Sequence, residues 1–389
     1  MTDAPLDWLE KHIGFEVFKS SLDQLKDVIQ NWELDKIPKE KVISIVGTNG
    51  KGQVTHELAR QLKSNGFNVF TFTSPHQIKL SERFQFNGQP IGDEEMLSLF
   101  ETVHKKLSQE EARLSFFEFL YVVFLQWVTE SDKEFDYVLF EAGLGGRLDA
   151  TKCIEAHLVI LTSIGRDHMS ILGHSLKQIL LEKLGILYPG NLLVYNLQLK
   201  SLKKILYEYT STHLVKTAFV PSDIGSDFYN RNNNLVRYVV TKEFGKNYFE
   251  SEQSPLREIS WRNKNIYFNS AHNLDGVRNL FQLLNGNSYN RSGTNIKYWD
   301  MILLAFSNRS TEELKSMVKL IESYPCLYNK IKVVIFDHPR ALSFLQAKDV
   351  FKNIEVEKLE SIQFAQKENV LLLGSNYIIK SLASLSSTV

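Results

Sequence analysis

Cysteine, net charge and long apolar runs are what this sequence of 389 residues has least of. Its two cysteines, Cys153 and Cys326, lie far apart and form no CxxC or Cys/His cluster, which argues against a disulfide framework and a structural zinc. Lys and Arg number 45, as do Asp and Glu, so the net charge of +0 gives no global field that would attract nucleic acid or an anionic membrane. Any phosphate site must therefore be local.

Signals for export or membrane insertion are also missing. No apolar run reaches the length of about 18 residues that suggests a membrane span. The first residues, MTDAPLDWLEKHIG, contain no apolar core flanked by basic residues. We therefore expect a cytoplasmic protein that binds neither a membrane nor nucleic acid.

Short runs rich in Val, Ile and Phe alternate with amphipathic stretches, which is the pattern of parallel strands joined by helices. The length is sufficient for two domains. We expect an α/β protein in which residues 1–255 form a domain with a mostly parallel sheet and residues 256–389 form a smaller, Rossmann-like α/β domain. The boundary is placed near Pro255 because the periodicity weakens over residues 216–255.

The strands and helices can be placed by residue range. Strands are expected at 42–46, 69–73, 136–141, 158–163 and 192–195, and again at 266–269, 301–306, 332–336 and 370–373. Helices are expected at 53–63, 116–128 and 235–242. A further helix should begin after Ser310, which has capping-box spacing with Glu313.

A glycine-rich loop follows the first strand. Residues 42–46 lead into Gly47-Thr48-Asn49-Gly50-Lys51-Gly52, and the helical pattern begins directly after them. Glycines let several backbone N–H groups converge on one phosphate oxygen, and the helix N-terminus adds its positive end. Lys51 supplies a charge for the β- and γ-phosphates. The order of strand, loop and helix therefore predicts a phosphate site.

This loop lacks the hydroxyl that usually binds magnesium, because Gly52 and Gln53 stand at that point of the sequence. In an open α/β sheet, ligands gather at the carboxyl ends of the parallel strands. Three other expected strands end in polar residues: Ser74 with His76, Glu141, and Asp167 with His168. We expect these strand ends to converge on the phosphates and to supply any metal ligands.

An ordered series of motifs runs along the chain: GTNGKG, TSPH with ERFQFNG, FFEF, FEAGLGGRLDAT, TSIGRDHMSILG, EKLGILYPG and NSAHN. Together they resemble the folylpolyglutamate synthase/dihydrofolate synthase family, which belongs to the ATP-dependent Mur ligase superfamily. The resemblance is strong over about residues 8–196 and looser over residues 257–389, and GLGGRLDAT is highly specific by itself. It implies a P-loop, Mur-ligase-like N-terminal domain.

The resemblance implies an ATP-dependent amide ligase. Members of the family join the amino group of L-glutamate to a carboxyl group of dihydropteroate or of a reduced folate, and they split ATP to ADP and phosphate. They first convert the carboxylate to an acyl phosphate, which the neutral amine of glutamate then attacks. The resemblance further implies Mg²⁺ or Mn²⁺ as cofactor and a monomeric protein.

The resemblance also assigns residues to sites. The ATP site contains Gly47, Thr48, Asn49, Gly50, Lys51, Gly52, Arg257 and Asn269. One metal is assigned to Ser74 and Glu141, and a second to His168 and a carbamylated Lys183. The pterin or folate site contains His76, Glu82, Arg83, Phe117 and Asp149, and glutamate is placed near His272, His338 and Ser375. The expected catalytic residues are Lys51, His168, Lys183 and His272.

Several positions depart from the family's pattern: Asn269 replaces Asp, Leu274 replaces Pro, Leu256 replaces Gly, Gln53 replaces Ser or Thr, and Lys152 replaces Asn. They leave open a divergent or degenerate homologue that binds ATP but has altered acceptor specificity or no activity. A P-loop switch that hydrolyses ATP without forming a bond is a further alternative. A cell-wall Mur ligase is not expected, because the loop begins at Gly47 and leaves no room for the N-terminal domain of those enzymes.

Overall fold

The computed structural model describes residues 3–14, 21–109, 113–222, 226–250, 256–262, 264–286, 298–365 and 368–386. They form two compact units. The N-terminal unit takes in the described parts of Thr2–Ser226 and Asn230–Glu250, and the C-terminal unit takes in Asp227–Tyr229 and the described parts of Ser251–Val389. Pro255, where the sequence places the domain boundary, lies outside the described residues. The division at 255/256 therefore stays a prediction.

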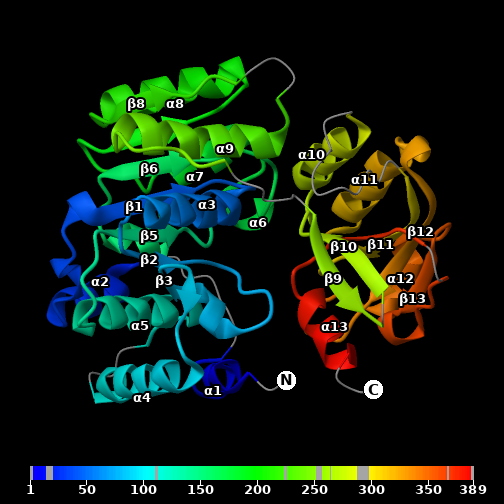
Figure 1. The fold of residues 1–389 in the computed structure, drawn as a ribbon, viewed down its shortest axis with the longest axis horizontal. Coiled ribbons are helices and arrows are strands. Elements are labelled where there is room, and N and C mark those ends of the chain that lie inside the picture. Colours follow the sequence, from blue (N-terminus) through cyan, green and yellow to red (C-terminus); the bar gives the residue numbers. More distant parts are fainter. Residues whose placement is uncertain are drawn as a thin grey trace. The chain divides into compact units, whose positions relative to one another are not determined.

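An eight-stranded sheet forms the centre of the N-terminal unit, in the order β4-β3-β2-β5-β1-β6-β7-β8 (Figure 1). Its strands are β1 (Val42–Val46), β2 (Val69–Phe72), β3 (Phe84–Phe86), β4 (Gln89–Pro90), β5 (Tyr137–Glu141), β6 (Leu158–Leu161), β7 (Leu192–Tyr195) and β8 (Lys216–Phe219). The strands from β2 to β8 in this order are parallel, and β3 and β4 pair in antiparallel fashion. The predicted mostly parallel sheet is confirmed.

The helices of this part of the chain are α1 (Ala4–His12), α2 (Asp23–Asn31), α3 (Lys51–Ser64), α4 (Asp93–Gln109), α5 (Phe116–Glu130), α6 (Met169–Leu172), α7 (Leu176–Leu184), α8 (Lys200–Thr212) and α9 (Phe228–Tyr238). Short 3-10 turns lie at Leu34–Lys36, Lys39–Lys41, Leu80–Arg83 and Ala150–Cys153, and a π turn at Val239–Glu243 follows α9. None of the helices in the described ranges is both long and apolar enough to cross a membrane.

Helices cover both faces of this sheet. Successive residues of a strand point to opposite faces, so the side chains of one strand contact helices on both sides. In β1, Val42 and Val46 belong to a cluster with residues of α5, α7 and α8. Ile43 and Ile45 belong to a second cluster, with residues of α3 and α9. The continuous apolar run of β1 is therefore the signature of a strand buried on both faces.

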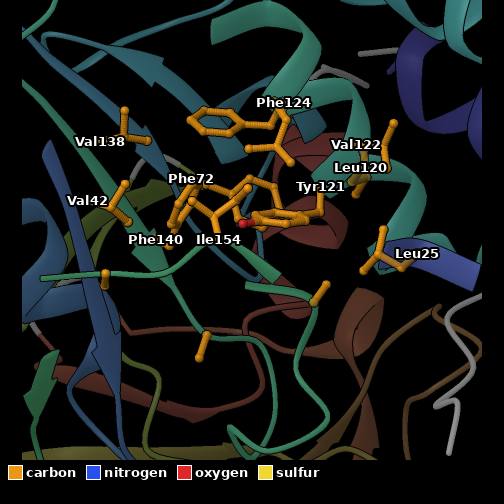
Figure 2. Packing of buried hydrophobic residues seen from close by; sticks show 14 of the residues in the cluster. Leu25, Val42, Phe72, Leu120, Tyr121, Val122, Phe124, Val138, Phe140 and Ile154 are labelled. Atoms are coloured by element: carbon orange, nitrogen blue, oxygen red, sulfur yellow. The ribbon is translucent and has the colours of Figure 1, made fainter. Parts of the chain in front are cut away.

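Aromatic side chains fill the face of the sheet under α5 (Figure 2). Phe72 of β2 and Phe140 of β5 pack against Tyr121 and Phe124 of α5, with ring centroids between 5.2 and 5.9 Å apart. Tyr121 is fully buried, and its hydroxyl has no hydrogen-bond partner among the described residues. Burial accordingly raises the pKa of Tyr121 well above its usual value.

The C-terminal unit is built on a six-stranded sheet in the order β13-β12-β11-β14-β10-β9. Its strands are β9 (Arg257–Trp261), β10 (Lys264–Asn269), β11 (Trp299–Ala305), β12 (Tyr328–Ile335), β13 (Glu355–Lys358) and β14 (Val370–Gly374), and only β9 pairs in antiparallel fashion. Its helices are α10 (Leu274–Asn285), α11 (Thr311–Glu322), α12 (Phe344–Val350) and α13 (Ile378–Ser386), with 3-10 turns at Pro325–Leu327 and Leu359–Ser361. Residues of α10, α11 and α12 pack with the strands in one apolar cluster. The predicted smaller C-terminal α/β domain is confirmed, and its sheet is mostly parallel.

Strands at or next to the sheet edges were missed by the sequence prediction. These are β3, β4, β8, β9 and β13. They are short or polar and so carry little of the apolar periodicity from which the central strands were predicted. The predicted start of α11 is confirmed, because the Ser310 side chain accepts from the Glu313 N–H at its N-cap.

The helix expected at 235–242 begins earlier, at Phe228. The polar residues 229–234 were interpreted as irregular, yet they form the first turns of α9. Asn232 within them is 1% exposed. A polar run can thus be helical when its side-chain amides form hydrogen bonds with residues far away in sequence. No local sequence pattern reveals those partners.

Replacing Tyr121 with Phe should not weaken the fold. Removing a buried hydroxyl that lacks a partner should raise the free energy of unfolding by about 1 kcal/mol, measured by urea denaturation. Phe124→Ala in the same cluster is the control and should lower it by about 3–5 kcal/mol. A loss of stability in Tyr121→Phe would mean that the hydroxyl makes a hydrogen bond after all.

Candidate active site

The glycine-rich loop connects β1 to α3, as the sequence predicts. Gly50 is the N-cap residue of α3, and Lys51 and Gly52 are its first residues. The Lys51 Nζ lies 3.3 Å from the Gly47 carbonyl oxygen and 3.5 Å from that of Thr48, so the cation folds back over the loop. The first N–H groups of α3 have no intrahelical acceptor and add a partial positive charge at the same place.

Hydrogen bonds tie this loop to the segment after β6. The Thr48 N–H donates to the Ser163 carbonyl at 2.9 Å, and the Thr48 hydroxyl donates to the Gly165 carbonyl and accepts from its N–H. The Ser163 hydroxyl accepts from the Asn49 N–H at 3.0 Å and donates to the Asn49 carbonyl at 2.9 Å. These bonds fix the loop in one shape before any phosphate binds.

Gly47 leaves no room for a side chain. A Cβ placed on it would lie 1.9 Å from the Thr162 Oγ1 and 3.1 Å from the Ser163 nitrogen. The Thr162 hydroxyl in turn donates to the Asn49 carbonyl at 2.8 Å. Any residue larger than glycine would therefore separate the loop from the end of β6.

Glu141 ends β5 beside the loop. Its carboxylate is buried and accepts from the Ser74 N–H at 3.2 Å, so the two residues assigned to the first metal lie together. A Cβ placed on Gly52 would be 3.6 Å from both carboxylate oxygens. Burial raises the pKa of Glu141, and the positive charge of Lys51 opposes this shift. The site thus holds a buried acid next to the first turn of α3.

Lys183, near the end of α7, points into the same loop. Its buried Nζ donates to the Gly47 carbonyl at 2.8 Å. Burial, with the nearby charge of Lys51, lowers the pKa of Lys183 to about 7, although Asp167 and Asp149 oppose the shift. The position of α7 is fixed by the GLGGR segment, because a Cβ placed on Gly146 would be 2.5 Å from the Lys183 carbonyl oxygen.

His168 follows β6 and is the N-cap residue of α6. Its Nε2 lies 3.9 Å from the Asp167 carboxylate, which is nearly buried while the imidazole is half exposed. Asp167 therefore acts on both His168 and Lys183, the two residues assigned to the second metal. Within the described ranges no group of three or more His, Cys, Asp or Glu side chains forms a ready metal site.

The residues assigned to the pterin or folate site fall into two groups. Arg83 is buried, its Nε donates to the His76 Nδ1 at 3.1 Å, and its guanidinium lies 5.5 Å from the centre of the Phe116 ring. Phe117 packs against Phe72, with ring centroids 5.5 Å apart. Arg83 also opposes the raised pKa of Glu141, so its charge reaches the phosphate side of the site.

Glu82 and Asp149 instead hold loops in place. The Glu82 carboxylate accepts from the N–H groups of Gln77, Ile78 and Lys79. The buried Asp149 carboxylate accepts from the Leu144 N–H and from the Thr151 N–H and hydroxyl. Both side chains organise segments of the site, and their direct contact with a ligand stays a prediction.

In the C-terminal unit, the assigned residues gather at one edge of the sheet. Asn269 is the last residue of β10 and Ser375 directly follows β14, while His338 lies in the segment after the carboxyl end of β12. Antiparallel β9 adds Arg257, which pairs with Phe268. The Nδ1 of His272 lies 2.7 Å from the Ser270 carbonyl, so this nitrogen carries the proton in that contact.

Two of the departures have a local explanation here. The Asn269 amide donates to the Tyr229 hydroxyl at 2.8 Å and accepts from the Ala271 N–H at 2.8 Å. Leu274 occupies the first position of α10, where proline is favoured but not required, and Asn273 caps the helix through its side chain. The fold thus accommodates Asn269 at the end of β10 and Leu274 at the start of α10.

Tyr377 is a residue that the sequence analysis did not identify. Its ring stacks on His338 with centroids 4.1 Å apart, and its hydroxyl accepts from the Arg340 Nη1 at 2.8 Å. Burial and the charge of Arg340 lower the pKa of His338 to about 4, which keeps the imidazole neutral. The Arg340 N–H donates to its Nδ1 at 3.0 Å. No motif marks Tyr377, because its partners His338 and Arg340 lie in the segment after β12, far away in sequence.

Thr162 and Ser163 were also not assigned to a site, whereas Asp167 was named with His168 at a strand end expected to converge on the phosphates. A signal for Thr162 and Ser163 was present, because they form the carboxyl end of the strand predicted at 158–163; in the structure they directly follow β6. Hydroxyl and carboxylate groups at parallel strand ends line the ligand edge of such sheets. Here Thr162 and Ser163 shape the phosphate loop through Asn49.

Replacing Gly47 with Ala should abolish ATP turnover, because the added methyl group collides with the Thr162 hydroxyl. Thr162→Ala alone should retain most of the activity. The double variant should recover part of what Gly47→Ala loses, since the contact at 1.9 Å disappears while those at 3.1 Å remain. Equal activity of Gly47→Ala and the wild type, measured as phosphate release, would show that the loop moves during binding.

Comparison with known proteins finds a similar sequence and similar solved structures. No family model matches the chain. The chain is similar to the dihydrofolate synthase/folylpolyglutamate synthase of Bacillus subtilis, with 27% identity over 433 aligned positions that cover 96% of this chain and 96% of that protein.

Solved structures share the fold. FolC of E. coli in complex with ADP superposes with a TM-score of 0.79 at 19% identity, covering 98% of this chain and 97% of that chain. A bifunctional folylpolyglutamate synthase/dihydrofolate synthase with Mn, AMPPNP and L-glutamate bound gives a TM-score of 0.76 at 20% identity, covering 98% and 96%. The ordered motifs, the match along nearly the whole B. subtilis protein and this shared fold support the similarity of the chain to the folylpolyglutamate synthase/dihydrofolate synthase family.

Proposed function

We propose that this chain is an ATP-dependent ligase that joins L-glutamate to dihydropteroate or to a reduced folate. The observation that carries the proposal is the buried Glu141 carboxylate, which lies against the Ser74 N–H and the first turn of α3. A phosphate loop with an acid at the neighbouring strand end is suited to phosphoryl transfer. The relatives' activities supply the identity of the acceptor and of the amino acid.

The proposed reaction has two steps. An oxygen of the acceptor carboxylate attacks the γ-phosphorus of ATP, the bond from that phosphorus to ADP breaks, and an acyl phosphate forms. The neutral amine of glutamate then attacks the acyl carbon, phosphate leaves with the bonding electrons, and the amine loses a proton. Lys51 and the N–H groups at the start of α3 stabilise the phosphate charge that shifts during the first step.

The donor set at Glu141 fits a divalent cation. The buried Glu141 carboxylate accepts from the Ser74 N–H, and a carboxylate and a serine hydroxyl are oxygen ligands of the kind that Mg²⁺ and Mn²⁺ prefer. When bound, such ions would neutralise charge on the phosphates and on the carboxylate being activated. His168 and Lys183 would hold a second ion best if Lys183 carried an anionic oxygen group, because an ammonium has no lone pair to donate and Mg²⁺ prefers oxygen ligands.

The fold accommodates the departures at Asn269 and Gln53, because both side chains have hydrogen-bond partners. Loss of activity therefore stays an outcome of the test rather than a second proposal. Within the same proposal, the chain acts in the cytoplasm as a monomer.

The test is phosphate release from ATP and Mg²⁺, with and without L-glutamate, using dihydropteroate in one series and tetrahydrofolate in another. We expect release that requires both glutamate and a pteroyl acceptor. Release that needs neither would favour the P-loop switch, and ATP binding without release would favour the degenerate homologue.

Lys51→Ala and Glu141→Ala should each reduce turnover by about 100-fold or more while the fold is kept. Lys63→Ala is the matched control, because Lys63 lies at the other end of α3 and only contacts the Asn87 carbonyl. Circular dichroism and thermal unfolding verify the fold of each variant. Normal turnover in either site variant would overturn the assignment.

Lys183 should react with CO₂ to form a carbamate. Carbamylation requires a neutral amine, and a pKa of about 7 leaves roughly half of the amines neutral at pH 7, against very few at the usual pKa. Protein freed of CO₂ should therefore regain activity with bicarbonate more completely at pH 8 than at pH 6. Carbon-13 bicarbonate should give a carbamate signal by NMR that Lys183→Ala lacks.

Lys183→Ala should regain part of its activity when a short carboxylate such as acetate is added, because the acid replaces the missing oxygens. Lys177→Ala, on the same helix, is the control and should not respond to acetate. If the carbamate signal and the rescue by acetate were both absent, the proposed pairing of His168 with a carbamylated Lys183 would be wrong.

A further inference from the structure

The polar run YNRNNN belongs to the first turns of α9. One of its amides, Asn232, is 1% exposed, although asparagine is mostly found at the surface. A buried amide has to be hydrogen-bonded, because an unpaired polar group costs free energy in the interior. The Asn232 amide therefore requires a hydrogen-bond partner inside the N-terminal unit.

Its partner is Gln53, one of the departures from the family's pattern. The Asn232 Nδ2 donates to the Gln53 Oε1 at 2.8 Å, and the Gln53 Nε2 donates to the Asn233 Oδ1 at 3.1 Å. Gln53 is the third residue of α3 and directly follows the phosphate loop. All three residues belong to the N-terminal unit, although about 180 positions separate them along the chain.

This arrangement needs a glutamine. Its amide uses both ends at once, accepting through oxygen and donating through nitrogen, so two asparagines fix its orientation. A serine or threonine hydroxyl sits on Cβ and is two bonds too short to reach the same place. The replacement of the hydroxyl residue is therefore matched by partners on α9.

The side chains of Gln53 and Asn232, called the amide pair below, act at the first turn of α3. The pair fixes Gln53, whose position determines the direction of the neighbouring N–H groups of Lys51 and Gly52. Apolar contacts secure α3 further along, through Val54, Leu58 and Leu62, but they lie on the face turned to the sheet. The amide pair adds a directional contact at the end of the helix that meets the phosphates.

We propose that Gln53 and Asn232 are positioning residues for ATP binding, with their amide pair holding the phosphate-binding turn of α3 against α9. The proposal rests on the proposed function only in taking the loop as an ATP site. In this proposal Gln53, which lacks the metal-binding hydroxyl of Ser or Thr, stabilises the phosphate loop instead.

The experiment compares Gln53→Leu, Asn232→Ala and the double variant with the wild type. Each single variant should raise the KM for ATP about 5–20-fold and leave the KM for glutamate within two-fold, a range set by the loss of one or two hydrogen bonds. The double variant should be no worse than the more impaired of the two single variants, because both substitutions remove the hydrogen bond between Gln53 and Asn232. Gln53→Ser should behave like Gln53→Leu.

Asn234→Ala is the matched control, since Asn234 lies on α9 outside this amide pair and should keep the wild-type KM for ATP. The Kd for a fluorescent ATP analogue, measured without glutamate or folate, gives a second readout that does not need turnover. Thermal unfolding identifies variants that are simply misfolded. Gln53→Asn, which shortens the amide by one carbon, provides a milder variant if Asn232→Ala does not fold.

Three outcomes would overturn the proposal. Folded variants with an unchanged KM and Kd for ATP would give the amide pair a purely structural role. Additive effects in the double variant would mean that the two residues act separately. If the wild-type chain binds no ATP at all, both this proposal and the proposed function fail, whereas ATP binding without glutamate-dependent release would overturn the proposed function alone.

Discussion

The attachment of the phosphate loop to the end of β6 is the constraint on which the rest of the site depends. The loop leaves β1 at the centre of the sheet, and its neighbours β5 and β6 bring Glu141 and residues 162–168 to the same edge. Hydrogen bonds between Thr48, Asn49 and Ser163 then fix the shape of the loop. Because these bonds are mostly to backbone atoms, they depend on the spacing of β1 and β6 rather than on loop composition alone.

Buried charge is concentrated around this loop. Lys183 reaches the Gly47 carbonyl from α7, and Glu141 reaches the first turn of α3 from β5. A buried group of either sign is costly unless it is paired or changes its protonation state. The shifted pKa values of both residues express that cost, and such shifts are concentrated at functional sites. The stability of the unliganded site is thus limited by groups that a bound nucleotide and its cations would neutralise.

The sequence predicted the central strands and the loop because burial on both faces leaves continuous apolar runs, as in β1 and β6. It did not predict the edge strands or the early start of α9, whose amides depend on a partner about 180 residues away. Glu82 and Asp149 show a further limit. Their residue type suggested ligand contact, yet backbone N–H groups from their own loops occupy the carboxylates. Residue type and strand position locate a site, whereas the division between ligand contact and loop support depends on packing.

The two sheets, each with its own apolar clusters, also differ in when they can form during synthesis. Nearly all residues of the N-terminal unit precede those of the C-terminal unit along the chain. A ribosome adds about 5–20 residues per second, so the remaining residues take on the order of ten seconds to emerge. During that interval the nascent chain already contains β1, α3, β5 and β6. The phosphate loop can therefore fold co-translationally, before the strand ends that carry His338 and Ser375 have been made.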